Sequence, residues 1–292
     1  MKLGFLLYLL WIAPLSAQPD AFSLGARIGY LDSTGTVLLP IEATDEDGAL
    51  YTGKGHSLRA KIKRWEAYSP AALDTLELPT IKYPRDPPLT LFYGEKSTAA
   101  TLSGFASLQV GCGETLPAHR IVSPWPDSDR HAPVPVLAVF DTNLALQPLA
   151  PLSAADPPAT LLAQITQANS PANGRQEDLW LHSGPVWINY QGFFNEQDLL
   201  TQARRTILRQ MDGQFQSIST TTRSTDMPLL QSANIKSWYR EFLGHVQAVY
   251  QLEGHLLFLS QYWGYESRAT YIEEAQAGKT VRLLYDGRYR GC

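Results

Sequence analysis

The sequence predicts an α+β protein built mainly of antiparallel β-structure, in two lobes joined by a connector rich in Pro and Ala. Short runs of alternating apolar and polar residues recur along the chain, and turns rich in Gly, Asp and Pro separate them. One longer segment shows helical spacing instead. With 292 residues, 44% of them hydrophobic, the chain is long enough to bury a substantial core.

The first residues, 1–17, are typical of a secretory signal peptide. Lys2 precedes an apolar run, Leu3–Leu15, which is too short to span a bilayer comfortably as a helix. Ala17 is a small residue at the cleavage point, so we expect the mature chain to begin at Gln18. No later segment has the ~18 consecutive apolar residues of a membrane helix. We therefore expect a periplasmic or secreted protein with no transmembrane span after cleavage.

The first lobe, residues 18–146, is predicted to be mostly β-structure. Asp32-Ser33-Thr34-Gly35 supplies the turn of a hairpin between residues 26 and 42. Further strands are expected at residues 58–63, 89–93, 100–110 and 134–140.

The connector, residues 147–176, differs in composition from both flanking segments. It is rich in Ala, Pro, Asn and Ser, and its prolines surround one short apolar stretch, Leu161–Ile165. We interpret it as a linker that contains at most a brief helix.

The second lobe, residues 177–292, contains the segment with the clearest helical pattern. Asn195 can cap a helix whose first turn holds Glu196 and Asp198, and Gly213 can end it. The apolar residues between these signals recur at helical spacing: Leu199, Leu200, Ala203, Ile207, Leu208 and Met211.

The last sixty or so residues fit either a helical stripe or strand alternation around His245. We favour a strand that begins near His245. Glu253-Gly254 and Gln276-Ala277-Gly278 then provide the turns of two consecutive hairpins at the end of the lobe.

The chain has two cysteines, Cys112 and Cys292, an even count that in an exported protein predicts one disulfide bond. Closing so long a loop would stabilise the fold by on the order of 5 kcal/mol in the entropic model. Cys112 lies between two glycines, where another segment can approach closely. The alternatives are two free thiols or an intermolecular bond.

Two features suit a polymeric ligand of the cell envelope. Arg59, Lys61 and Lys63 share one face of a predicted strand, where they can meet an anionic polymer. Trp263, together with Tyr262 and Tyr265, can stack on sugar rings. Alternating charges are also typical of a solvated sheet face, and clustered aromatic residues are also typical of a core.

Two other groups of residues were considered as sites. His119, Asp127, Asp129 and His131 carry groups that a divalent metal accepts, but Pro-rich loops commonly carry such residues only to make turns. If residues 241–245 are helical, Glu241 and His245 share one face and can act as an acid/base pair. If His245 begins a strand, they do not share a face.

No signature of a nucleophilic enzyme, a metalloprotease or a phosphate-binding loop is present, and no cofactor is expected. The formal net charge of −4 argues against a nucleic-acid partner, because such binding depends on a basic surface.

Three short segments near the end of the chain, residues 244–250, 255–258 and 281–289, resemble the C-terminal hairpins of the CsiV-type family. The resemblance covers about the last fifth of the chain. Leu284-Tyr285 stands where that family has His-Tyr before the Asp, and the family's paired Arg is missing. The resemblance implies a periplasmic, peptidoglycan-associated protein that supports cell-wall synthesis without being an enzyme, and it implies no individual functional residue.

These observations together predict an exported, non-enzymatic binding or scaffold protein of the bacterial cell envelope, with peptidoglycan or an envelope protein as its partner. The alternative is an envelope hydrolase with dispersed carboxylates. A close pair of buried carboxylates in a deep cleft would favour the hydrolase.

Overall fold

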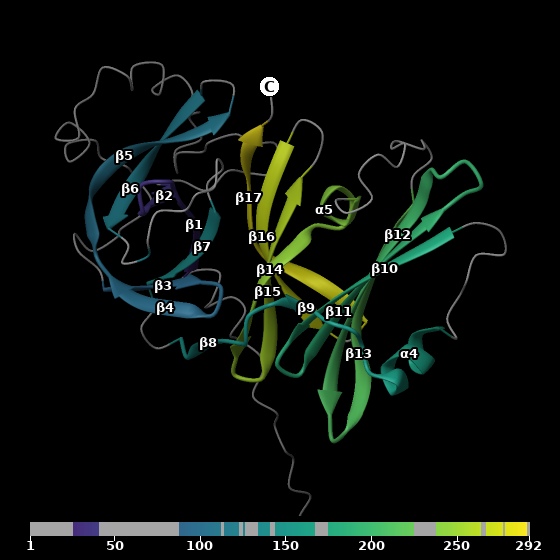
Figure 1. Cartoon of the computed structure of the whole chain (residues 1–292). Coiled ribbons are helices and arrows are strands. Elements are labelled where there is room, and N and C mark those ends of the chain that lie inside the picture. Colours follow the sequence, from purple (N-terminus) through teal and green to yellow (C-terminus); the bar gives the residue numbers. More distant parts are fainter. Residues whose placement is uncertain are drawn as a thin grey trace, which may run out of the picture.

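The computed structural model describes residues 26–40, 88–111, 114–122, 125, 134–140, 144–166, 175–224, 238–263, 267–276 and 278–290. These residues form three antiparallel sheets and short helices (Figure 1). The mainly antiparallel β prediction is therefore confirmed. Among the described helices, none is long and apolar enough to cross a membrane. The predicted signal peptide, residues 1–17, lies outside the described part of the chain, so the compartment remains a prediction.

The curled sheet, whose strands run from purple through blue to teal in Figure 1, has seven strands in the order β4-β3-β7-β1-β2-β6-β5. One hydrophobic cluster of this sheet includes Leu31, Val37, Leu91, Ile121 and Val136. The strands are β1 (Ala26–Leu31), β2 (Thr36–Pro40), β3 (Leu89–Tyr93), β4 (Lys96–Ala100), β5 (Leu102–Gly111), β6 (Glu114–Val122) and β7 (Val134–Val139).

The predicted hairpin between residues 26 and 42 is formed by β1 and β2. Asp32 closes its turn, because the Asp32 Oδ1 atom accepts hydrogen bonds from the backbone nitrogens of Thr34 and Thr36, each at 2.9 Å. Gly35 has a φ of 74°, a conformation that glycine adopts without steric cost. Residues within the turn are therefore sufficient to explain this hairpin.

The middle sheet, yellow-green to yellow in Figure 1 except for the teal β8, has the strand order β17-β16-β15-β14-β8. The strand predicted near His245 and both terminal hairpins are confirmed. Glu253 and Gly254 have φ values of 47° and 91°, as a two-residue hairpin turn requires. The strands are β8 (Leu146–Pro148), β14 (His245–Leu252), β15 (His255–Trp263), β16 (Ser267–Gln276) and β17 (Lys279–Arg290).

The outer sheet, green in Figure 1, has the strand order β13-β12-β11-β10-β9. Its strands are β9 (Ser153–Ala154), β10 (Arg175–Ser183), β11 (Val186–Phe194), β12 (Leu200–Met211) and β13 (Gln214–Ser224). The brief helix predicted in the connector is α4 (Ala159–Thr166), and a second short helix, α5 (Trp238–Phe242), precedes β14.

The helix predicted between Asn195 and Gly213 is wrong, because this segment forms strand β12. Both faces of the outer sheet are covered. Ile207 packs into the core shared with the middle sheet, whereas Leu208 packs with Trp187 on the opposite face. Consecutive buried residues of this kind imitate helical spacing. The α component of the predicted class is accordingly limited to short helices in the described chain.

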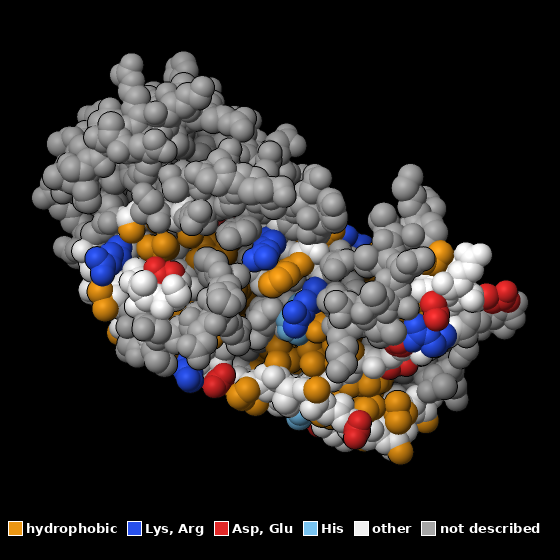
Figure 2. Space-filling model, turned by 45° about the horizontal axis from the view of Figure 1, so that its top comes forward, with side chains coloured by type: hydrophobic (Ala, Val, Ile, Leu, Met, Phe, Trp, Pro, Cys, Tyr) orange, Lys and Arg blue, Asp and Glu red, His pale blue; other side chains and the backbone are white. Residues whose placement is uncertain are grey.

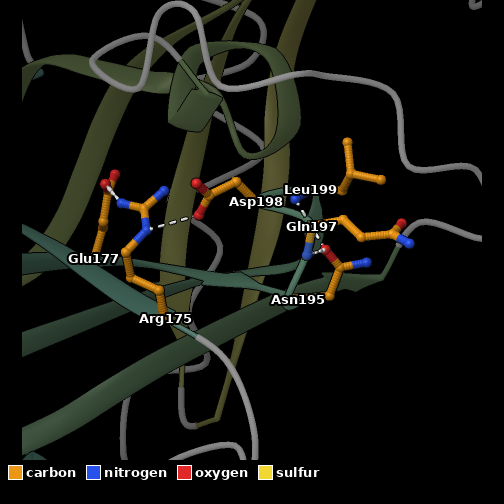
Figure 3. Close-up of polar contacts among 6 residues, drawn as sticks. All are labelled: Arg175, Glu177, Asn195, Gln197, Asp198 and Leu199. Atoms are coloured by element: carbon orange, nitrogen blue, oxygen red, sulfur yellow. Dashed lines mark hydrogen bonds and ion pairs between the residues drawn. The ribbon is translucent and has the colours of Figure 1, made fainter.

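The two ends of the mispredicted segment are hairpin turns. The Asn195 Oδ1 atom accepts hydrogen bonds from the backbone nitrogens of Gln197 and Leu199, each at 3.0 Å (Figure 3). An Asn side chain makes such bonds to the following backbone N–H groups both in a turn and at the start of a helix. At the other end, Asp212 and Gly213 have φ values of 50° and 77° and form the two-residue turn into β13.

The middle sheet lies between the other two sheets and shares a core with each (Figure 1). Tyr190 and Ile207 of the outer sheet lie in one cluster with Phe258. On the other side, Leu137 of the curled sheet lies in one cluster with Ile272. The middle sheet is therefore packed on both faces, and this packing holds the side chains at its ends in place.

The outer and middle sheets are also joined along both edges. On one side, the segment from β8 to β9, which begins at the last residue of the predicted first lobe and continues into the predicted connector, gives one edge strand to each sheet. On the other side, the backbone nitrogen of Gly278 donates to the carbonyl oxygen of Ile218 at 3.0 Å. The predicted lobe boundaries at residues 146 and 176 remain a prediction.

Candidate functional site

Of the predicted binding residues, Tyr262 and Trp263 lie in the described structure, at the end of β15. Both are half-buried. The other predicted site residues lie outside the described residues: Tyr265, Arg59, Lys61 and Lys63, and the cysteines Cys112 and Cys292. The disulfide and the basic strand face therefore remain predictions.

Arginine side chains lie over aromatic rings at the end of the middle sheet. The guanidinium carbon of Arg268 is 4.2 Å from the centroid of the Trp263 ring, and that of Arg240 is 5.8 Å from the same centroid. Arg223 lies 5.8 Å from the ring centroid of Tyr262. The arginine–aromatic cluster is defined here as Arg223, Arg240, Arg268 and Arg282 with the rings of Tyr239, Tyr262, Trp263, Tyr271 and Tyr285.

Strand pairing explains part of this cluster. Trp263 and Arg268 are directly opposite each other in the β15–β16 ladder, so their side chains share one face of the sheet. Tyr271 and Tyr285 are likewise opposite each other in the β16–β17 ladder. Arg282 lies over both rings, at 4.9 Å from the centroid of Tyr271 and 5.0 Å from that of Tyr285.

The remaining arginines come from other elements. Arg240 belongs to α5, and Arg223 belongs to β13 of the outer sheet. Arg223 therefore reaches Tyr262 from the outer sheet, and Arg240 reaches Trp263 from α5. Tyr262 and Trp263 are consecutive in β15, so their side chains leave opposite faces of the middle sheet, and each face combines positive charge with a flat apolar ring.

Three arginines of this cluster have no carboxylate partner in the part of the chain that the structure describes. Within the described residues, no Asp or Glu forms an ion pair with Arg223, Arg240 or Arg282. The whole chain nevertheless has a formal net charge of −4. Figure 2 shows Lys or Arg side chains set among hydrophobic side chains in the middle of the face that it presents. Stacking on a ring leaves the N–H groups of a guanidinium free to bind an anion at its edge.

His245 lies next to this cluster. Its ring centroid is 5.3 Å from that of Tyr239. Burial, together with the positive charge of Arg240, lowers the pKa of His245 to about 4. The imidazole is therefore neutral at neutral pH. Because α5 ends at Phe242 and His245 begins β14, Glu241 and His245 do not share one helix, as the acid/base pair suggested by the sequence would require.

Two buried tyrosine hydroxyls, one from the outer sheet and one from the middle sheet, bond to the backbone beside the cluster. The Tyr190 hydroxyl donates to the carbonyl oxygen of Gly244 at 3.2 Å and accepts from the backbone nitrogen of Val246 at 3.0 Å. The Tyr271 hydroxyl donates to the carbonyl oxygen of Leu243 at 3.1 Å. Burial raises the pKa of both tyrosines, so both hydroxyls keep their protons. These bonds fix the link between α5 and β14.

Gly244 is required at this link. Its φ of 76° is in the left-handed region, and a Cβ atom there would lie 2.0 Å from the Tyr271 hydroxyl oxygen. The ring of Tyr271 therefore reaches the α5–β14 link only because position 244 has no side chain.

The buried carboxylates of the described chain do not form a catalytic pair. Glu273 faces the outer sheet and forms an ion pair with Arg205, whereas Glu274, its neighbour in the chain, points to the opposite face and contacts the Nδ1 atom of His255 at 2.5 Å. Asp286 is opposite Thr270, four residues before Glu274, which is a separation of about 13 Å along the strand. Glycosidase carboxyl pairs are roughly 5–10 Å apart.

Of the four residues in the candidate metal-binding group, only His119 lies in the described structure. His119 is half-buried in β6, and burial lowers its pKa. Asp127, Asp129 and His131 lie outside the described residues. Where the structure does describe side chains, it contains no group of three or more His, Cys, Asp or Glu that would hold a metal ion.

The chain matches no protein-family model, no curated protein and no solved structure. The resemblance of its last hairpins to the CsiV-type family therefore remains a hypothesis that rests on the residues alone.

Proposed function

We propose that the protein is an exported, non-enzymatic binding protein of the bacterial cell envelope, and that it binds an anionic glycan, peptidoglycan, through the arginine–aromatic cluster. The observation that carries this proposal is the stacking of Arg223, Arg240 and Arg282 on aromatic rings with no carboxylate partner in the described part of the chain. The signal-peptide pattern of residues 1–17 and the resemblance to the CsiV-type family support the compartment and the ligand.

The chemistry of the cluster suits a carboxylated sugar polymer. Guanidinium groups bind carboxylates through paired N–H donors, and indole and phenol rings pack against the apolar faces of sugars. Concentrated positive charge on an acidic protein also directs an anionic polymer to this region and away from the rest of the surface.

The rival hydrolase hypothesis has less support. The buried acids Glu273 and Glu274 point to opposite faces of β16, and Asp286 lies about 13 Å along the strand from Glu274. A general acid and a nucleophile or base would need to face one substrate together. The non-enzymatic proposal needs no such pair.

Co-sedimentation with purified peptidoglycan sacculi tests the proposal. We expect the purified protein to sediment with sacculi at low salt and to be released as the ionic strength rises. The double variant Arg223→Gln/Arg282→Gln removes two exposed charges of the cluster and should weaken retention about tenfold.

Lys96→Gln/Arg120→Gln is the matched control, because it removes two exposed charges from β4 and β6. It should leave retention unchanged. Equal losses in the two double variants would show that only overall charge matters and would overturn the assignment to the cluster. Failure of the unchanged protein to sediment would overturn the proposed function itself.

A further inference from the structure

We infer that Arg240, His245 and Trp263 form a subsite for a single carboxylate group of peptidoglycan. This inference deepens the proposed function and rests on it. Arg240 and Trp263 belong to the arginine–aromatic cluster, and His245 lies next to it. In this subsite the protein recognises the charge of the ligand as well as its sugar ring.

The subsite is marked by three polar atoms that lack partners. The Nε atom of Arg240, the Nδ1 atom of His245 and the Nε1 atom of Trp263 are buried, and none has a hydrogen-bond partner in the described structure. Buried polar atoms are nearly always paired in folded proteins, because an unpaired one has lost its hydrogen bonds to water without compensation. Three such atoms in one neighbourhood indicate a site that is completed by something that binds there.

The three side chains are neighbours. The guanidinium carbon of Arg240 lies 5.8 Å from the centroid of the Trp263 ring. Arg240 is also close enough to His245 for its charge to lower the pKa of that imidazole. Tyr239 packs against His245 and fixes the orientation of its ring from the α5 side.

The unpaired atoms specify the chemistry of the ligand. The Nε–H group of Arg240 and the Nε1–H group of Trp263 are donors only, whereas the Nδ1 atom of a neutral imidazole donates in one tautomer and accepts in the other. A ligand that pairs with Arg240 and Trp263 must therefore supply acceptors. A carboxylate offers two oxygen atoms with room for several donors, whereas a sugar hydroxyl or an acetamide offers one acceptor oxygen and no charge for Arg240.

The subsite can open without breaking an ion pair. Each of the three side chains is half-buried and keeps part of its surface exposed, while the unpaired atoms face inward. No carboxylate of the described chain holds Arg240, which rests on the rings of Tyr239 and Trp263. A change of rotamer at Arg240 therefore brings its N–H groups to an incoming carboxylate at little cost.

Two carboxylates of peptidoglycan have the required chemistry. One is carried by the muramic acid of strands from which the peptide has been removed, and the other by the stem peptide. The probes N-acetylmuramic acid and a muramoyl peptide with a free carboxylate distinguish these sources. N-acetylmuramic acid methyl ester and N-acetylglucosamine are the uncharged controls.

The experiment follows the indole N–H resonance of Trp263 by NMR of the ¹⁵N-labelled full-length mature protein. Trp263→Phe identifies the resonance by its disappearance, and it keeps an aromatic ring while removing the donor. We expect N-acetylmuramic acid or the muramoyl peptide to shift this resonance and to bind about tenfold more tightly than the methyl ester. Trp263→Phe should lower the affinity for the acid about tenfold and leave the affinity for the ester unchanged.

Trp187→Phe is the matched control, because Trp187 packs on the far side of the outer sheet, away from the cluster. It should leave the affinity for every probe unchanged. Equal affinities for the acid and its methyl ester, or an unshifted Trp263 resonance with both acidic probes, would overturn the subsite. If sacculi still retain the protein in that case, the proposed function stands and only the carboxylate subsite is lost.

Discussion

Arg205 of β12 and Glu273 of β16 form a buried ion pair that joins the outer sheet to the middle sheet. The two side chains are 2% and 7% exposed. Burial opposes the charged form of Arg205, but the carboxylate of Glu273 and the nearby Tyr190 and Tyr271 more than offset it, so the pKa of Arg205 is raised. The guanidinium therefore stays charged, and its Nε and Nη1 atoms have no partner in the described structure.

Removing one member of this pair should be far more damaging than removing both. We expect Arg205→Met to lower the free energy of unfolding by about 3–5 kcal/mol, because it leaves the Glu273 carboxylate buried without a cation. The double variant Arg205→Met/Glu273→Leu replaces the pair by apolar groups and should recover most of that loss. Urea unfolding measures both. A double variant as unstable as the sum of the single variants would contradict this account.

The Cys112–Cys292 bond is a prediction from the sequence, and both residues lie outside the described part of the chain. If the bond forms, the thiols of the exported, folded protein should resist alkylation, and Cys292→Ser should lower the melting temperature by roughly 5–10 °C. Cys112→Ser and the double variant should have the same melting temperature as Cys292→Ser, because each removes the same bond. Full labelling of both thiols, or additive effects of the two substitutions, would disprove the bond.

The turn between β11 and β12 depends on the side chain of Asn195. Its Oδ1 atom is the acceptor for two backbone N–H groups, those of Gln197 and Leu199 (Figure 3). Asn195→Ala should lower the free energy of unfolding by about 1 kcal/mol, because it removes both acceptor contacts. Asn195→Asp keeps an acceptor oxygen and should cost less. Thermal unfolding of the two variants measures the difference, and equal losses would show that the side chain does not close the turn.

A second side chain braces the same turn. The Arg175 Nε atom donates to the Oδ1 atom of Asp198 at 3.1 Å, and Arg175 also forms an ion pair with Glu177 (Figure 3). Asp198 has a φ of 57°, an uncommon conformation for a residue with a side chain. Because the side chains of these ion pairs keep part of their surface in water, each pair contributes at most about 1 kcal/mol.

Local signals in the sequence were enough to predict the hairpins. The bonds of Asp32 and the left-handed conformations of Glu253 and Gly254 involve only neighbouring residues, so the same turns are readable in the sequence. Strand β12 was not predictable in this way. Its neighbours Ile207 and Leu208 are both buried because other segments cover both faces of the outer sheet, and periodicity alone does not reveal a second cover.

The candidate site shows the same limit. Aromatic clustering in the sequence indicates Trp263 as a candidate. The predicted hairpin could also have indicated Arg268, because the two residues are opposite each other in its ladder. Arg223 and Arg240 come from β13 and α5, and only the packing of separate elements brings them to the cluster. The helical prediction for residues 195–213 also concealed Arg205, because it gave no reason to place that residue between two sheets.

The buried imidazole of His245 should make stability depend on pH. Burial and the charge of Arg240 lower its pKa to about 4 in the folded protein, whereas the ordinary value is 6.5, so the unfolded chain binds its proton at higher pH than the folded chain does. The free energy of unfolding should therefore fall as the pH is lowered from 6.5 to 4, by on the order of 3 kcal/mol from this residue, and change no further below that window. Urea unfolding of the protein and of His245→Gln at several pH values isolates this share, because the difference between the two curves cancels the other titrating groups. A difference that is constant across the window, or an NMR titration that places the pKa of His245 near 6.5 in the folded state, would contradict the buried, neutral imidazole.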